Sequence, residues 1–472
     1  MSEARAGTAE FLLPRRFGGL AGFWRWPLSS PSGELAGTLL LWPLLLIVSL
    51  WNGFPLIFYD TGAYIFEGFG NRFVAERSPV YSLFLVFTGG GWSLWLVVLV
   101  QAAATAFVMV ETARCVAPRL HLGLLAAIGG ALVLLTGLPW YVGQIEPDCF
   151  TALVVLSLYL LAFHARKLGA WRSAALVAIA GLATGAHPSH LGLAAGLVAV
   201  LATYGVVIRL HRAASWPHAN LVLPVLSAVL GFALVFAGNY HFTRHVFISK
   251  AGPVFVFARM LQDGLVKDLL NDTCPQSHYA LCAYRNALPD RADKWLWGPR
   301  TPFLALHRFD GTENESERIV LDSLERYPLL NLGLALRDSI QQFMTFRTGD
   351  QIEPQQWVLY PDFHTYIPGQ VRAYASARQQ KGGIDFRPVN AVHEPIGWIA
   401  LAFLVAMLAM AWRERDVKSA ALLGFVLAAL LGNAVICGAL SNPHARYQSR
   451  LIWVPAFALI LLGSERRLLR DA

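Results

Sequence analysis

The acidic, basic and histidine side chains that could do chemistry in this chain fall into short stretches separated by long hydrophobic runs. The stretches are residues 59–64, 67–77, 144–148, 187–190 and 444–450, together with one long polar segment. Only a membrane topology would bring stretches so far apart in sequence to one place. Charge inside a membrane bundle is costly, so convergence of these stretches on one side of a membrane would indicate a site.

Asp60 leads these candidates because it directly follows the first hydrophobic run. One interpretation is a helix N-cap at the membrane surface, for which Asp is a preferred residue. The other is a general base that takes the proton of an acceptor hydroxyl as it attacks an activated donor. The two interpretations are compatible. Tyr59 and Tyr64, on either side of Asp60, are candidate substrate contacts.

Two arginines, Arg72 and Arg77, follow Asp60 in the same loop. They would either contact a phosphate or form salt bridges with Glu67 and Glu76. The sequence leaves both alternatives open, and we keep Arg77 as a candidate phosphate contact.

Glu146 and Asp148 flank a proline at the start of a later hydrophobic run. They could cap a helix and interact favourably with its dipole, but two acids around a proline are more than capping needs. They could instead bind a divalent cation, orient an acceptor sugar, or share catalytic work with Asp60. A divalent cation is the one cofactor that the sequence suggests, with Glu146 and Asp148 as its candidate ligands.

His187 and His190 lie in a short loop between two hydrophobic runs, where Pro188 stops the first of them. Two histidines at this spacing could ligate a metal. Such histidines more often bind a phosphate or a nearby acid, so we expect these two residues to contact substrate.

His444, Arg446 and Arg450 precede the last hydrophobic run. On a helix, Arg446 and Arg450 are one turn apart and share a face. Guanidinium groups bind phosphate oxygens bidentately, so the cluster suits a phosphate or pyrophosphate at a membrane interface. The alternative is that the arginines extend to lipid headgroups. Their place on the side that is otherwise poor in basic residues favours phosphate binding.

The composition is that of a polytopic membrane protein rather than of a soluble domain. Of 472 residues, 56% are apolar and only 14% are charged. A net charge of +8 would suggest nucleic acid in a soluble protein. Here the basic residues sit in short loops between apolar runs, and no basic stripe with interleaved aromatics is present, so nucleic acid is not an expected partner.

Membrane spans of roughly 20 apolar residues are expected at ten places. We predict them at about 35–57, 91–113, 120–139, 148–165, 173–187, 190–208, 220–242, 395–412, 418–439 and 450–464, with a short apolar helix at 79–88 and no cleavable signal peptide. Residues 1–34 would form a cytoplasmic or interfacial segment. Lys and Arg are concentrated in alternate loops, which predicts cytoplasmic termini and an outer face that carries all the candidate residues. In a bacterium this places the chain in the inner membrane.

The polar segment 243–394 is predicted to be an insert on the outer, periplasmic face, between bundle parts at 35–242 and 395–472. It is long enough for a domain of its own, of mixed or mainly helical structure. Apolar spacing across 316–346 predicts a helix broken at Pro328, with one face on the bundle or the bilayer. Cys274 and Cys282 are expected to pair in an oxidising compartment.

Several of these motifs resemble the GT-C superfamily of polytopic glycosyltransferases, which use polyprenyl-phosphate-linked sugars. The resemblance rests on an acid soon after the first span (Asp60), the segment Arg77 to Tyr81, the acids at Glu146 and Asp148, and the element Ala445 to Pro455. It covers about residues 35–242 and 395–464. It implies that Asp60 is the catalytic carboxylate and that Arg446 or Arg450 contacts a lipid phosphate. The position of the insert, before the last three spans rather than after the bundle, departs from many members.

The sequence thus predicts an all-α polytopic membrane protein with a GT-C-like bundle that transfers a sugar from a polyprenyl-phosphate donor to an acceptor glycan, lipid or protein. Its other partners would be membrane lipids. Two alternatives remain open: a transporter or flippase-like protein for a lipid-linked saccharide, and a non-catalytic assembly partner. The scarcity of ionisable residues within the spans weakens a proton-coupled pathway. Neither the sugar nor the acceptor follows from the sequence.

Overall fold

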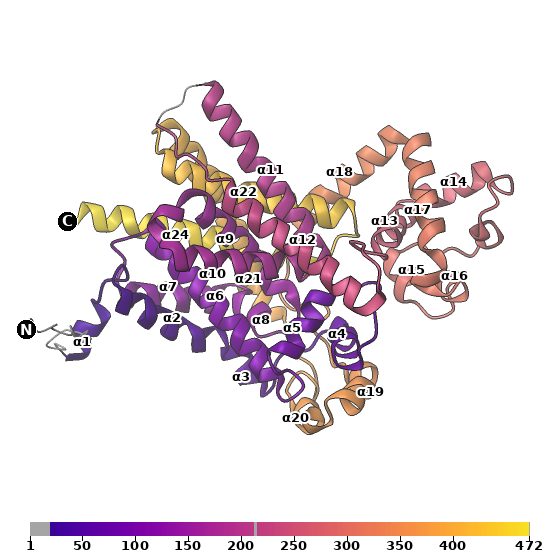
Figure 1. Cartoon of the computed structure of the whole chain (residues 1–472), viewed down its shortest axis with the longest axis horizontal. Coiled ribbons are helices and arrows are strands. Elements are labelled where there is room, and N and C mark those ends of the chain that lie inside the picture. The colour runs from indigo at the N-terminus through magenta and orange to yellow at the C-terminus, as the bar shows by residue number, and fades with distance from the viewer. Residues whose placement is uncertain (1–18, 212–214, 472) are drawn as a thin grey trace, which may run out of the picture.

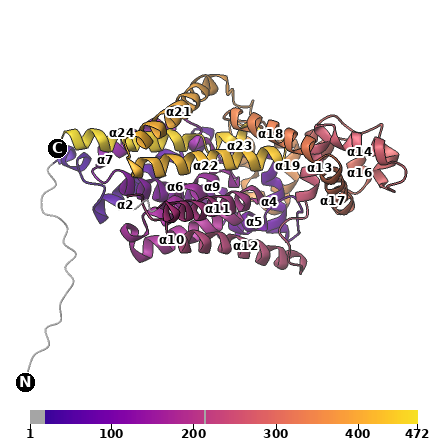
Figure 2. The same cartoon turned by 90° about the horizontal axis from the view of Figure 1, so that it is seen from above.

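A computed structural model describes residues 19–211 and 215–471, and in these ranges the chain is built of helices. The described ranges contain no β-strand, only two isolated bridges, Pro27 with His121 and Leu56 with Gln144. Long helices lie side by side in a bundle, and a smaller group of helices projects from one end (Figures 1 and 2). Residues 1–18, which hold most of the predicted interfacial segment, lie outside the described residues.

Seven helical segments in the described ranges are long and apolar enough to cross a membrane. They are α2 and α3 together (Pro31–Leu45 and Ile47–Asn52), α6 (Leu94–Val116), α10 (Ala165–Gly185), α11 (Pro188–Leu210), α12 (Val222–Thr243), α21 (Arg387–Arg413) and α22 (Val417–Ala439). By the length and composition of these helices, the chain is an all-α multi-pass membrane protein. The predicted span at 173–187 extends back to Ala165 across non-helical backbone at Gly169.

The other three predicted spans are also helices, but each falls short of a full apolar span. α7 (Leu122–Leu135) and α9 (Phe150–Phe163) have 14 residues each, or about 21 Å. α9 is enclosed by its neighbours, since its residues from Phe150 to Ala162 are all buried. α24 (Trp453–Arg470) ends in a charged segment. The short helix expected at 79–88 is α5 (Pro79–Phe87), which packs on α4 (Tyr59–Gly70) and α12.

The two ends of the bundle differ in what they carry. α1 (Gly19–Trp24) and the end of α24 lie at one end, and the projecting helices lie at the other (Figures 1 and 2). This arrangement is the one expected if both ends of the chain share a membrane face and the insert occupies the opposite face.

The structure divides the predicted insert into two parts. The first part has its own core, built around Phe257, Trp295 and Phe303. Its elements are α13 (Gly252–Gln262), α14 (Leu265–Thr273), η2 (Ala280–Tyr284), α15 (Ala292–Trp297), α16 (Pro302–Ala305) and α17 (Arg308–Arg326). The second part joins the bundle: Phe363 and Tyr374 pack with Phe54 in the main core. Its elements are α19 (Gln356–Tyr366), η3 (Pro368–Gln370) and α20 (Val371–Ser376).

α18 (Pro328–Met344) links the two parts and packs along α22. The predicted break before it falls at Tyr327 and Pro328. α18 buries polar residues, among them Asp338 and Gln342, whereas Leu332 and Leu336 are exposed. This reversed amphipathic pattern agrees with a helix that turns its polar face to the bundle.

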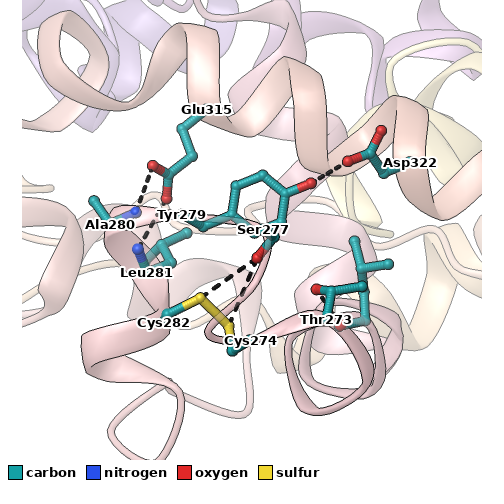
Figure 3. The surroundings of a disulfide bond; sticks show 10 residues. Thr273, Cys274, Ser277, Tyr279, Ala280, Leu281, Cys282, Glu315 and Asp322 are labelled. Atoms are coloured by element: carbon teal, nitrogen blue, oxygen red, sulfur yellow. Dashed lines mark hydrogen bonds between the residues drawn. A yellow bond between two sulfur atoms is a disulfide. The ribbon is translucent and has the colours of Figure 1, made fainter.

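Cys274 and Cys282 form a disulfide in the first part of the insert, as the sequence predicts. Figure 3 shows the hydrogen bonds around it. Glu315 of α17 accepts from the backbone N–H groups of Ala280, at 2.8 Å, and Leu281, at 2.9 Å. The disulfide loop is thereby attached to α17, next to the core that α17 helps to form.

Candidate functional site

Asp60 lies in the first turn of α4, where the chain leaves the first candidate span. Thr61 supplies the side-chain hydrogen bonds at the start of α4. Its hydroxyl accepts from the Phe58 N–H at 3.0 Å and donates to the Ile145 carbonyl at 2.9 Å. The backbone of Leu56 also pairs with residues 143 and 145. These bonds hold the Asp60 segment against the segment that carries Glu146 and Asp148. The carboxylate of Asp60 therefore does not cap the helix and pairs with arginines instead.

Two arginines from distant parts of the chain meet at Asp60. Arg77 donates to Asp60 Oδ1, and Arg446 Nη2 lies 3.5 Å from Asp60 Oδ2. The predicted salt bridge of Arg77 to Glu67 or Glu76 is not formed, and Arg77 lines the cavity described below, where contact with a phosphate stays a prediction. Glu67 instead accepts from the Val74 N–H and the Ser82 hydroxyl. Arg77 and Arg446 are largely buried, each with 11% of the side chain exposed.

Arg446 also approaches Asp148, which belongs mainly to a deeper ion pair. Arg450 Nη1 lies 2.7 Å from Asp148 Oδ1, whereas Arg446 Nη1 is 3.9 Å from Asp148 Oδ2. Arg450 further donates to the Ser189 hydroxyl at 3.0 Å and to Asn433 Oδ1 at 3.3 Å. Arg446 lies in α23 (Ala445–Ser449), and Arg450 directly follows it. The sequence predicted one role for both arginines. In the structure, Arg450 is enclosed by protein groups, whereas Arg446 lines the cavity described below.

Glu146 is buried beside this ionic centre without an ion-pair partner in the described part of the chain. Its Oε1 has no hydrogen-bond partner there. Burial raises the pKa of Glu146, and the negative charges of Asp60 and Asp148 raise it further. Glu146 therefore adjoins the ionic centre without forming an ion pair in it.

A cavity of about 370 Å³ opens directly on Asp60, Arg77 and Arg446. Its walls are of two kinds. The polar wall comes from the bundle and from Asp293 of α15. The apolar wall is formed by the loop before α13, by α13 and α15, and by the end of α22. The lining residues are Phe58, Asp60, Glu76, Arg77, His187, Pro188, Ser189, Ile248, Ser249, Gly252, Phe255, Val256, Asp293, Leu296, Trp297, Gln351, Ile436, Cys437, Leu440, Ser441, Asn442, His444, Arg446 and Tyr447.

His444 connects the bundle to the insert at the mouth of this cavity. Its Nε2 lies 3.3 Å from Asp293 Oδ1, and its Nδ1 lies 3.8 Å from Asp350 Oδ2. Gln342 of α18 fixes the His444 backbone with one hydrogen bond in each direction, both 2.9 Å long. The pKa of Asp293 is lowered because His444 binds its carboxylate, assisted by Asn442.

The other predicted site residues take separate positions. His187 lines the cavity and bonds with Ser189, whereas His190 is buried and bonds with Thr151 and the Ala183 carbonyl. Their imidazole rings are 5.2 Å apart. The histidines are thus already engaged by protein groups, and only His187 faces the cavity.

The two tyrosines near Asp60 stand outside the cavity lining. Tyr59 is 40% exposed, and Tyr64 is buried with its ring 4.8 Å from that of Tyr81. Neither tyrosine lines the cavity, and their role as substrate contacts stays a prediction.

Glu146 and Asp148 do not belong to a cluster of metal-ligand side chains in the described ranges. In the described ranges, no three or more His, Cys, Asp or Glu side chains gather in a way that could hold a metal ion. Asp148 Oδ1 is engaged by Arg450. Divalent cations such as Mg²⁺ need several anionic or carbonyl oxygens, so the cation that the sequence suggests at Glu146 and Asp148 stays a prediction.

Sequence reasoning missed the contribution of the insert. Asp293 and Trp297 of α15 both line the cavity, and the Trp297 ring lies 5.8 Å from the Arg77 guanidinium carbon. Their spacing of four residues places them on one helix face, which is the signal that could have marked them. No pattern in the insert indicated which of its faces meets the bundle.

No family model, curated protein or solved structure matches this chain. The class that fold and composition define is therefore that of an all-α multi-pass membrane protein. At one end of its bundle, a carboxylate and two arginines face a cavity that is part polar and part apolar.

Proposed function

We propose that the protein is a membrane glycosyltransferase that moves a sugar from a polyprenyl-phosphate carrier to an acceptor hydroxyl. The observation that carries the proposal is that Asp60, Arg77 and Arg446 face one cavity whose other wall is apolar. A donor of this class has a sugar, a phosphate and a hydrocarbon chain. The cavity offers a carboxylate, guanidinium groups and apolar side chains to those three parts.

In the proposed reaction, the donor phosphate binds Arg446 and Arg77. Asp60 accepts the proton of the acceptor hydroxyl, whose oxygen forms a bond to the anomeric carbon while the bond from that carbon to the phosphate oxygen breaks. The electron pair of the broken bond stays on the lipid phosphate, where the guanidinium groups stabilise the charge. The resemblance to GT-C enzymes implies inversion at that carbon. Glu146 does not line the cavity, which leaves Asp60 as the proton acceptor.

The distribution of polar groups favours an enzyme over a transporter. The site lies at the insert end of the bundle, whereas a second ionic cluster of Glu34, Glu111, Arg114 and Arg172 joins α2, α6 and α10. Between these clusters, the central helix α9 is almost wholly apolar and buried. A saccharide crossing the bundle would need polar partners along its path, and α9 supplies almost none.

The predicted topology places this reaction on the periplasmic face of a bacterial inner membrane. The positive-inside pattern and the common end shared by α1 and the end of α24 support that placement. The disulfide between Cys274 and Cys282 supports it as well, because disulfides persist in oxidising compartments.

The test is Asp60→Asn in membranes supplied with labelled polyprenyl-phosphate sugars. We expect transfer to fall at least about a hundredfold, the contribution typical of a general base. Asp362→Asn is the matched control: its carboxylate, carried by α19, lies next to Gly62 of α4, the helix that holds Asp60, but does not line the cavity. Thermal unfolding of both purified variants checks that they fold. A folded Asp60→Asn protein with full transfer activity would contradict the proposal.

A further inference from the structure

A second cavity lies at the opposite end of the bundle from the candidate site. It has a volume of about 490 Å³ and opens between α11, α21 and α22. Apolar side chains dominate its lining, among them Phe163, Leu201, Leu408 and Phe425. α11, α21 and α22 are all candidate membrane spans, so a cavity between them opens toward lipid.

A smaller cavity of about 320 Å³ shares Tyr204 with the apolar one and contains two basic side chains in a partly apolar lining. Tyr204 lines both cavities, and its hydroxyl donates to the Pro217 carbonyl at 2.8 Å. Arg209 and His218 line only the smaller cavity. Arg209 is exposed and forms no ion pair with another described residue. Its charge is therefore available to an anion.

We propose that the two cavities together bind one anionic phospholipid, with an acyl chain in the larger cavity and the phosphate at Arg209 and His218. The apolar and cationic compartments meet at Tyr204, as the tail and headgroup of such a lipid meet. Basic residues near the headgroup level attract anionic lipids, and Arg209 supplies that charge here.

Two Trp residues that line the apolar cavity, Trp216 and Trp412, indicate its depth in the membrane. The Trp216 and Trp412 rings are 5.2 Å apart, and both line the apolar cavity. Trp side chains favour the level of the headgroups, where the ring is apolar and the N–H is hydrated. The junction of the two cavities would therefore lie at headgroup depth. This site does not depend on the proposed transferase activity.

The experiment is native mass spectrometry of the full-length, delipidated protein titrated with single lipids. Phosphatidylglycerol, phosphatidylcholine of the same chains, and polyprenyl phosphate are compared. We expect phosphatidylglycerol to bind tighter than phosphatidylcholine, and Arg209→Gln to weaken phosphatidylglycerol binding about fivefold, the effect of about 1 kcal/mol per basic residue, while polyprenyl phosphate binding, assigned to the candidate site, should not change in that variant. Binding of phosphatidylcholine should not change in that variant.

Gly424→Leu tests the apolar cavity directly. Gly424 lines it, and the nearest atom to an added Cβ, in Leu408, is 4.0 Å away, so the new side chain fills space without a clash. Gly196→Leu is the control, since Gly196 has no atom within 4 Å and lies outside the cavity. Loss of phosphatidylglycerol from Gly424→Leu alone supports the site. Equal binding of phosphatidylglycerol by both variants, or equal binding of the two phospholipids by the wild-type protein, would overturn it.

Discussion

Replacing Arg450 with methionine is expected to destabilise the protein by about 3–5 kcal/mol, the typical cost of removing one partner of a buried ion pair. The Arg450 side chain is 0% exposed, and that of Asp148 is 2% exposed. Without Arg450, the nearest remaining cation to Asp148 is Arg446, at 3.9 Å. The variant also removes the donors to Ser189 and Asn433. The loss therefore leaves a desolvated carboxylate with one weak partner.

A double-mutant cycle with Asp148→Asn measures how much of this loss comes from the pair itself. We expect the free energy of unfolding to fall in each single variant, and the double variant to lose less than the sum, with a coupling of about 1–3 kcal/mol. Unfolding is followed in detergent micelles by circular dichroism. Arg387→Met serves as a control, because Arg387 pairs with Asp385 at the surface and no measurable change is expected.

The sequence predicted that Arg450 binds lipid phosphate, whereas the structure pairs it with Asp148. Arg450→Met distinguishes between these two roles. Suppose that Arg450→Met keeps wild-type stability but loses affinity for a polyprenyl phosphate. Arg450 would then be a ligand-binding residue, and its assignment to the Asp148 pair would be refuted.

Three other variants test further parts of the structure. Arg446→Met should abolish sugar transfer with a smaller loss of stability than Arg450→Met, which labelled-sugar assays and thermal unfolding measure together. Burial raises the pKa of Glu67 from its ordinary 4.5 to about 7. The folded state therefore binds more protons between these values, and stability should fall by up to about 3 kcal/mol as pH rises from 4.5 to 7; Glu67→Gln should flatten this slope. Serine at both Cys274 and Cys282, which are eight residues apart, should destabilise the first part of the insert by about 2.5 kcal/mol. Limited proteolysis at 251–320 detects that loss, and unchanged protection would contradict it.

The convergence of Asp60 with Arg446 could be predicted from sequence because a membrane restricts topology. Apolar runs of span length must cross, so loops in alternate positions share a face. That rule alone places Asp60, Asp148, His187 and Arg446 at one end of the bundle. The structure adds the distance of 3.5 Å between Asp60 and Arg446, which no hydropathy pattern specifies.

The sequence could not reveal which arginine faces the cavity. The spacing between Arg446 and Arg450 is the same whichever of them faces the cavity, and both guanidinium groups approach Asp148. Their difference comes from α22, whose Asn433 and Cys437 enclose Arg450. Tertiary burial by another helix is invisible to local spacing.

The sequence could not predict which part of the insert joins the main core, for a different reason. Its sequence looks uniformly polar, yet its second part contributes Leu359 and Phe363 to the main core. A short amphipathic helix carries the same pattern whether it packs on its neighbours in sequence or on a distant bundle. Only the contact of α19 with α4 decides between these outcomes.

The two arginines that line the cavity suit a phosphate better than a neutral sugar alone. Arg77 and Arg446 both contact the Asp60 carboxylate, and Arg446 does so at the longer distance of 3.5 Å. Guanidinium groups bind phosphate oxygens well. A phosphate monoanion that draws Arg446 toward itself would loosen this longer contact with Asp60. Donor binding would then free the carboxylate at the moment when an acceptor hydroxyl needs a base.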